Sequence, residues 1–183
     1  MIKEIRKGLV VLSLSIGLSA CVATAPSSVS ESEQSVSIER DEFNGQTWIR
    51  TPLFLSRQGF TDTFPVSIAY RALYKDQERV FIQLYVTKKS TEWGFYHTAN
   101  GQDGTELPFV DVDKQVDANT QLGSVYVDED FALKLSRDYL SKMSQEDWKI
   151  KVYGKRDEGV FMVPKTFTQG FLNKLECYEA GNC

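Results

Sequence analysis

The clearest pattern along the chain is a pair of runs, residues 66–73 and 80–87, in which every second position is apolar or aromatic. This alternation is the periodicity of a strand that rests one face on a hydrophobic core. The polar residues 75–78 separate the two runs and suit a tight connection. We therefore predict an antiparallel hairpin in this part of the chain.

Shorter runs rich in β-branched and aromatic residues predict further strands. They cover residues 47–55, interrupted at Pro52, and residues 93–98, 107–112, 124–127, 149–153 and 160–163. Residues 100–104 and 154–159 are turns with the Asn, Asp and Gly content that turns require, and residues 117–123 are expected to form a loop. Connections this short favour antiparallel neighbours over crossover units.

Two helices are predicted in the C-terminal half. The acidic residues 128–130 suit the first turn of a helix, and an apolar face follows at four-residue spacing, formed by Phe131, Leu135, Tyr139 and Met143. A second helix begins near Thr166 and turns inward Phe167, Phe171, Leu172 and Leu175. The sequence thus predicts an α+β fold, a mainly antiparallel sheet of about seven strands with two helices in the C-terminal half.

The N-terminal residues have the features of a secretion signal. Three basic residues within positions 3–7 precede an apolar run at residues 9–18, which is shorter than the ~20 residues that span a bilayer. The run ends in Leu18-Ser19-Ala20-Cys21.

This tetrapeptide resembles the lipobox of bacterial lipoproteins. The resemblance implies cleavage before Cys21, diacylation of its sulfur and acylation of its amine, and therefore attachment to the membrane through the lipid. Val22 follows Cys21 where Asp would favour the inner membrane, so the resemblance favours the outer membrane. Two other interpretations remain open at this point: a plain secretory signal cut after Ala20, or an uncleaved helical anchor.

Three segments follow from these patterns. Residues 1–20 are the predicted lipoprotein signal peptide, residues 21–38 a lipid-anchored flexible linker, and residues 39–183 a single domain. The linker is rich in Ser, Glu and Ala and lacks aromatic residues, so it cannot bury enough surface to offset its ordering entropy. A flexible segment of about 20 residues has a reach of roughly 25 Å, which would let the domain stand off the membrane.

Charge narrows the choice of partner. Loss of residues 1–20 removes three basic residues and one acidic residue, which changes the formal net charge from −4 to −6. A nucleic-acid partner is not expected, because phosphate binding requires clustered cations. Anionic headgroups would also repel an acidic body.

The cysteines divide between two roles. Cys21 is assigned to the lipid, which leaves Cys177 and Cys183 near the C-terminus. In an oxidising compartment we expect these two to form a disulfide. No metal site is expected, because His and further Cys residues are missing nearby.

Candidate chemistry is sparse. His97 is the only histidine and follows Trp93 and Tyr96 on a predicted aromatic strand, so these three residues are the speculative binding site. Asp111 and Asp113 alternate on one strand and are expected to share a face, as a pair of acid–base carboxylates would. The sequence shows no nucleophile elbow, no phosphate-binding loop and no sign of a cofactor.

The leading functional expectation is a non-enzymatic, lipid-anchored envelope lipoprotein. It would face the periplasm from the outer membrane and bind, or assemble with, another envelope protein. One alternative is a lipoprotein that binds a small molecule or glycan in a pocket at the aromatic strands. A third is a hydrolase that uses Asp111 and Asp113, with both carboxylates in a cleft and their pKa values raised.

Overall fold

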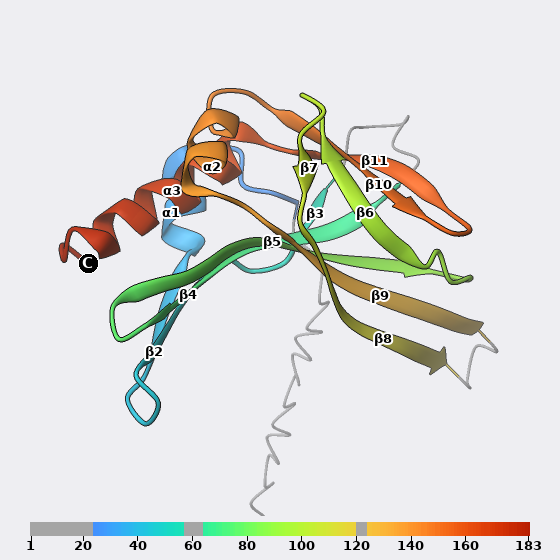
Figure 1. The fold of residues 1–183 in the computed structure, drawn as a ribbon, viewed down its shortest axis with the longest axis horizontal. Helices are drawn as coiled ribbons and strands as arrows, with labels where there is room; N and C mark the ends of the chain where they lie inside the picture. Colours follow the sequence, from blue (N-terminus) through green and yellow to red (C-terminus); the bar gives the residue numbers. More distant parts are fainter. Residues whose placement is uncertain (1–23, 57–63, 120–123) are drawn as a thin grey trace, which may run out of the picture.

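Two antiparallel sheets and three helices make up the described part of the chain (Figure 1). The computed structural model describes residues 24–56, 64–119 and 124–183. The signal peptide and the tetrapeptide Leu18–Cys21 lie outside the described residues. None of the described helices is long and apolar enough to span a bilayer.

The larger sheet contains seven strands in the order β1-β2-β4-β5-β9-β8, with β3 paired to the same edge of β4 as β2. Its strands are β1 (Ser37–Asp41), β2 (Gln46–Arg50), β3 (Phe54–Ser56), β4 (Val66–Lys75), β5 (Glu78–Ser90), β8 (Phe109–Asn119) and β9 (Ser124–Lys134). The predicted hairpin is confirmed as β4–β5, which turns at Asp76 and Gln77. Pro52 separates β2 from β3, because proline cannot donate to a sheet ladder.

The smaller sheet has the order β11-β10-β6-β7. Its strands are β6 (Tyr96–Gly101), β7 (Glu106–Leu107), β10 (Trp148–Gly154) and β11 (Glu158–Val163). The last predicted pair of strands is confirmed as the β10–β11 hairpin. The strand expected at residues 93–98 begins instead at Tyr96 and continues to Gly101.

The helices are α1 (Val29–Ser35), α2 (Arg137–Met143) and α3 (Lys165–Glu179). Together with the smaller sheet they cover one face of the larger sheet (Figure 1). The core lies between these layers. Tyr70 of β4 stacks on Phe171 of α3 at 4.8 Å between ring centroids, and Phe131 of β9 packs against Tyr96 of β6 at 5.8 Å.

A buried polar group ties the layers together. The hydroxyl of Thr168 lies 2.8 Å from the Tyr70 hydroxyl and accepts a hydrogen bond from Nε1 of Trp148 at 3.2 Å. All three side chains are fully buried. Each polar atom is therefore satisfied inside an otherwise apolar core.

The helix predicted to begin at residues 128–130 is wrong. These residues belong to β9, which continues to Lys134, and α2 starts only after the cap at Ser136. The hydroxyl of Ser136 accepts a hydrogen bond from the backbone N–H of Tyr139. The spacing of Phe131, Leu135, Tyr139 and Met143 resembled one helical face because only two residues, Leu135 and Ser136, separate the strand from the short helix.

The flexible linker expected at residues 21–38 is also corrected within its described part. Helix α1 and the start of β1 lie inside it. Ser32 is fully buried and its hydroxyl donates to the carbonyl oxygen of Phe167 at 3.2 Å. Small polar side chains thus allow α1 to approach α3 closely, and the segment gains order from tertiary contact rather than from its own composition.

The antiparallel character of the fold is confirmed, and the described residues contain three helices where two were expected. The additional helix is α1, which the sequence analysis assigned to the linker. The predicted strand at residues 107–112 is divided into β7 and the longer β8. The predicted short strand at residues 124–127 is the beginning of the long strand β9.

Candidate functional site

Two of the three residues proposed from the aromatic strand, Tyr96 and His97, point to opposite sides of it. Tyr96 is buried, packs edge-on against Phe64 and donates its hydroxyl to Asp157 at 2.6 Å. Burial and this hydrogen bond raise the pKa of Tyr96 well above its ordinary value. His97 is the next residue on β6 and is exposed, with Nδ1 3.2 Å from the carbonyl oxygen of Phe95. Strand alternation therefore sends Tyr96 and His97 to opposite sides.

Trp93 lies in the segment that leads into β6, and a buried carboxylate fixes that segment. Glu129 of β9 accepts hydrogen bonds from the backbone N–H of Gly94 at 2.5 Å and of Phe95 at 3.0 Å. Phe95 has a φ of 54°, a conformation that bulky residues seldom adopt. The sequence pattern did not predict this role, because the acidic residues 128–130 are typical of the first turn of a helix.

Asp111 and Asp113 do not share a face of the sheet. A register shift between them places Asp111 opposite Phe131 and Asp113 opposite Asp130 on β9. Both carboxylates are exposed, and Asp111 is paired with Lys114. Hydrogen bonds from the Gln115 side chain and the Lys114 backbone N–H lower the pKa of Asp113. The geometry therefore gives no support to an acid–base pair, which would need a cleft and a raised pKa.

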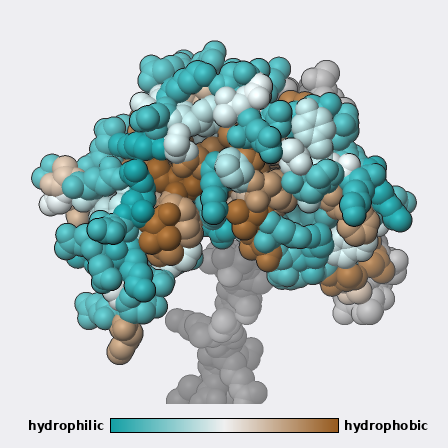
Figure 2. All heavy atoms as spheres, in the orientation of Figure 1, coloured by the Kyte–Doolittle hydropathy of each residue, from teal (hydrophilic) through white to brown (hydrophobic). Residues whose placement is uncertain are grey.

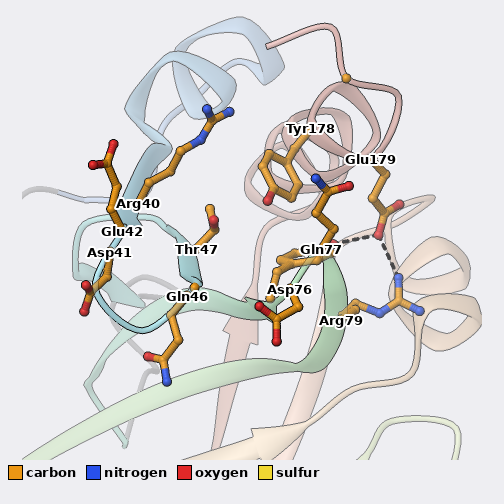
Figure 3. Close-up of a pocket in the computed structure, with 13 residues that line it drawn as sticks. Arg40, Asp41, Glu42, Gln46, Thr47, Asp76, Gln77, Arg79, Tyr178 and Glu179 are labelled. Carbon is orange, nitrogen blue, oxygen red and sulfur yellow. Dashed lines mark hydrogen bonds and ion pairs between the residues drawn. The ribbon is translucent and has the colours of Figure 1, made fainter.

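A groove of about 820 Å³ opens between the β1–β2 hairpin, the β4–β5 turn and the end of α3 (Figure 3). Its walls are polar. Arg40, Asp41 and Glu42 come from the β1–β2 side, and Tyr178 and Glu179 come from the other side. No sequence motif pointed to this groove, because its residues come from three separate segments of the chain.

Glu179 is the centre of charge pairing in the groove. Its Oε1 accepts hydrogen bonds from the Tyr74 hydroxyl at 2.6 Å and from the Arg79 guanidinium at 2.8 Å. Its second oxygen lies 3.8 Å from Arg137. Burial and the adjacent carboxylate raise the pKa of Tyr74 well above its ordinary value. The hydroxyl is thus a hydrogen-bond donor at neutral pH and not a base.

The floor of the groove depends on two unusual turns. Gly45 has a φ of 66° and its carbonyl oxygen accepts from the backbone N–H of Asp76 at 3.0 Å. A Cβ atom at position 45 would lie only 2.7 Å from a carboxylate oxygen of Asp76. Asp76 and Gln77 also have positive φ angles. The two hairpin ends therefore meet closely and leave a defined depression beside them.

Beside the groove, a disulfide links Cys177 in the last turn of α3 to Cys183, which follows the helix; their Cα atoms lie 5.5 Å apart. Among the residues described, no three His, Cys, Asp or Glu side chains are grouped so that they could hold a metal ion.

A second candidate site is the free edge of β8. This strand ends the larger sheet and pairs only with β9 within the described residues. Side chains at positions 111–118 are all exposed. Val116 and Val125 are 62% and 56% exposed and lie on the same face of the sheet as the buried Val127. Figure 2 shows hydrophobic side chains gathered toward this end of the molecule.

Comparison of the chain with protein-family models, with curated proteins and with solved structures found no match.

Proposed function

We propose that this chain is a non-enzymatic envelope lipoprotein with an α+β domain that binds another envelope protein. In this proposal Cys21 carries the lipid, the anchor lies in the outer membrane, and the domain faces the periplasm. The partner adds an extended segment to the free edge of β8. The observation that carries this proposal is an edge strand of 11 residues with exposed side chains from Asp111 to Ala118.

Strand addition suits this edge for a physical reason. An edge strand presents unpaired backbone N–H and C=O groups, which an extended peptide satisfies as it extends the sheet. The apolar stripe formed by Val116 and Val125 continues the core face of the sheet beyond the part that the smaller sheet covers. An added strand could cover that stripe with its own apolar side chains.

Charge on β8 selects the partner. The strand carries Asp111, Asp113 and Asp117 but only one cation, Lys114, which pairs with Asp111; Lys89 of β5 pairs with Asp117. Charged residues on an edge also suppress indiscriminate pairing with other chains. The partner segment should therefore carry basic residues that face these carboxylates. Because the irregularity between Asp111 and Asp113 interrupts the ladder, pairing is expected over Asp113–Asn119.

Site-specific photo-cross-linking in intact cells tests the proposal. A photoreactive residue at Gln115 should capture one envelope protein through a segment that contains basic residues, and Asp113→Lys with Asp117→Lys should abolish that product. The matched control is a photoreactive residue at Val160, which is also exposed on an edge strand but belongs to the smaller sheet. Equal products at the two positions, or products that survive the charge reversals, would contradict the proposal.

The anchor is tested separately. Cys21→Ala should move the protein from the membrane fraction to the soluble fraction, and the mass of the wild-type N-terminal peptide should include acyl chains. A cross-linked product at twice the mass of this chain would assign the β8 edge to self-association instead of to a different protein.

The groove favours a second candidate function, the binding of a polar ligand such as a glycan. Gln46, Gln77 and Thr47 offer side-chain amides and a hydroxyl, and Tyr178 offers a ring on which a sugar could stack. A panel of neutral and amino-sugar oligosaccharides, titrated while amide chemical shifts are recorded, tests this function. Shifts confined to the groove and lost in Gln77→Ala would support it. Shifts that are absent, or spread over the surface, would argue against it.

A further inference from the structure

The described chain becomes part of the domain only three residues after Cys21. Thr24 forms a parallel bridge with Leu55 of β3. The hydroxyl of Thr166 in α3 donates to the carbonyl oxygen of Pro26 at 3.0 Å, and Ala25 packs against the core. Three residues can span roughly 10 Å at full extension. A lipid on Cys21 would therefore hold the domain against the bilayer instead of some 25 Å away, the distance expected from a flexible linker of this length.

The described chain begins at an edge of the larger sheet. Thr24 pairs with β3, which is part of the larger sheet. We call the face of this sheet turned away from α3 and the smaller sheet the open face; it carries Trp48, Phe81, Tyr85 and Tyr126. In Figure 1 none of the described helices lies over the open face, and the β1–β2 and β8–β9 hairpins both reach past the body of the molecule on that side.

Aromatic side chains on the open face lie beside cations, two of which also form ion pairs: Arg50 with Glu39 and Lys89 with Asp117. The guanidinium of Arg50 lies 5.2 Å from the ring centre of Trp48, and that of Arg71 lies 4.5 Å from the ring centre of Tyr85. Near the end of the β8–β9 hairpin, Nζ of Lys89 lies 5.2 Å from the ring of Tyr126. Aromatic rings and long basic side chains together suit the headgroup region of a bilayer, which is apolar at one end and wet at the other.

The tip of the β1–β2 hairpin carries the most exposed apolar side chain on the same side. Phe43 is 103% exposed, and its backbone N–H donates to the side chain of Asp41 at 3.0 Å. Figure 1 shows the tip of the β1–β2 hairpin standing clear of the rest of the molecule. Exposure of a phenylalanine side chain to water is unfavourable, and its insertion at a lipid interface would remove that unfavourable contact.

We infer that the domain lies directly on a phospholipid surface, with its open face toward the bilayer and Phe43 and Tyr126 in contact with lipid at two separated points. The inference rests on the proposed lipid anchor at Cys21. Asp41 and Glu42 flank Phe43, and Glu39, Asp113 and Asp117 lie on the open face itself. Anionic headgroups would repel these carboxylates, so the favoured surface is zwitterionic. This orientation leaves the outer side of the smaller sheet away from the membrane.

Fluorescence in reconstituted vesicles tests the orientation. The lipidated full chain is purified with one added thiol at Phe43→Cys, Tyr126→Cys or Val160→Cys, labelled with an environment-sensitive dye and placed in phosphatidylcholine vesicles. Lipid blocks Cys21 and the disulfide blocks the remaining thiols. We expect a blue shift and quenching by brominated lipid at positions 43 and 126, and neither effect at position 160, where the side chain projects from the smaller sheet away from the larger one.

Two further measurements test the membrane attachment and the orientation of the domain separately. Vesicle flotation shows whether the lipidated protein is membrane-bound; if it does not float, the anchor fails and the orientation fails with it. If it floats while the dyes at positions 43 and 126 behave like the dye at position 160, the anchor stands and the orientation is wrong. A Gly-Ser insertion of about 20 residues before Thr24 lengthens the reach to roughly 25 Å and should move the signal at position 43 toward that at position 160.

Discussion

The hydroxyl of Ser32 in α1 donates a hydrogen bond to the main-chain carbonyl of Phe167 in α3, which lies 135 positions later in the sequence. This contact joins the segment after the predicted lipid site to the last helix of the chain. It is close because Gly170 has no side chain; a Cβ atom there would lie 2.5 Å from the Ser32 hydroxyl and 2.6 Å from the backbone nitrogen of Glu33. The α1–α3 contact therefore holds this N-terminal segment against the domain.

Gly170→Val should separate α1 from α3. The added methyl groups have no space, so we expect faster amide hydrogen exchange across residues 29–35 and a loss of about 1–3 kcal/mol in the free energy of unfolding. Asn173→Ala is the control, because it removes only an exposed hydrogen bond to Glu33 and should cost less than about 0.5 kcal/mol. Unchanged exchange in α1 of the Val variant would show that the helix docks without this contact.

Asp103 should make stability depend on pH in acid. Hydrogen bonds from the Lys142 ammonium and the Thr105 backbone N–H hold its pKa below the ordinary value in the folded state. The stabilisation is therefore present at neutral pH and is lost as the pH falls below the unfolded-state value of about 3.9. Because the Lys142 side chain is largely exposed, we expect Asp103→Asn to cost at most about 1 kcal/mol at neutral pH.

Urea unfolding at several pH values measures this difference. The stability curves of the wild type and Asp103→Asn should converge as the pH falls below about 4. The matched control is Glu106→Gln, an exposed carboxylate on the neighbouring strand β7, whose curve should stay close to that of the wild type throughout. Parallel curves for wild type and Asp103→Asn would contradict the role given to this carboxylate.

Sequence patterns predicted the local elements of this fold better than its long-range contacts. The β4–β5 hairpin could be predicted because apolar residues alternate on both sides of a short polar segment. The role of Glu129 cannot be predicted in this way, because its partners, the backbone N–H groups of Gly94 and Phe95, lie 35 and 34 positions earlier in the chain. An acidic residue in a strand has low intrinsic preference for that state, and only the hydrogen bonds to a distant segment justify its place.

The candidate binding surfaces also depend on contacts between distant segments, which the sequence pattern does not predict. The groove combines hairpin ends with the end of α3, and no residue in it carries a recognisable motif. The edge position of β8 depends on strand order, which a single sequence does not specify. The docking of residues 24–36 depends on small residues such as Ser32 and Gly170 at one crossing point. Composition suggested a linker there because it reports average hydrophobicity and not complementarity of shape.

We expect Thr168 to contribute to the free energy of unfolding through the hydrogen bonds of its hydroxyl and not through its size. Thr168→Val keeps the shape but leaves the Tyr70 hydroxyl and the Trp148 indole N–H without this partner in the core. An unsatisfied buried polar group costs about 1–3 kcal/mol, so we expect a clear fall in the free energy of unfolding. Thr168→Ser keeps the hydroxyl and should lose less. Equal losses in the two variants would mean that packing of the methyl group, and not hydrogen bonding, dominates at this position.

Glu129→Ala should release the segment that leads into β6. The substitution leaves the backbone N–H groups of Gly94 and Phe95 without their acceptor and removes the contact that holds Phe95 at positive φ. Hydrogen bonds to a charged group contribute about 1.5–3 kcal/mol, so we expect a loss of that order and rapid amide exchange at residues 94 and 95. Glu129→Gln keeps one carbonyl acceptor in place and should retain part of the protection. If Glu129→Ala and Glu129→Gln protect these two amides as well as the wild type does, the main chain holds the positive φ of Phe95 without the carboxylate.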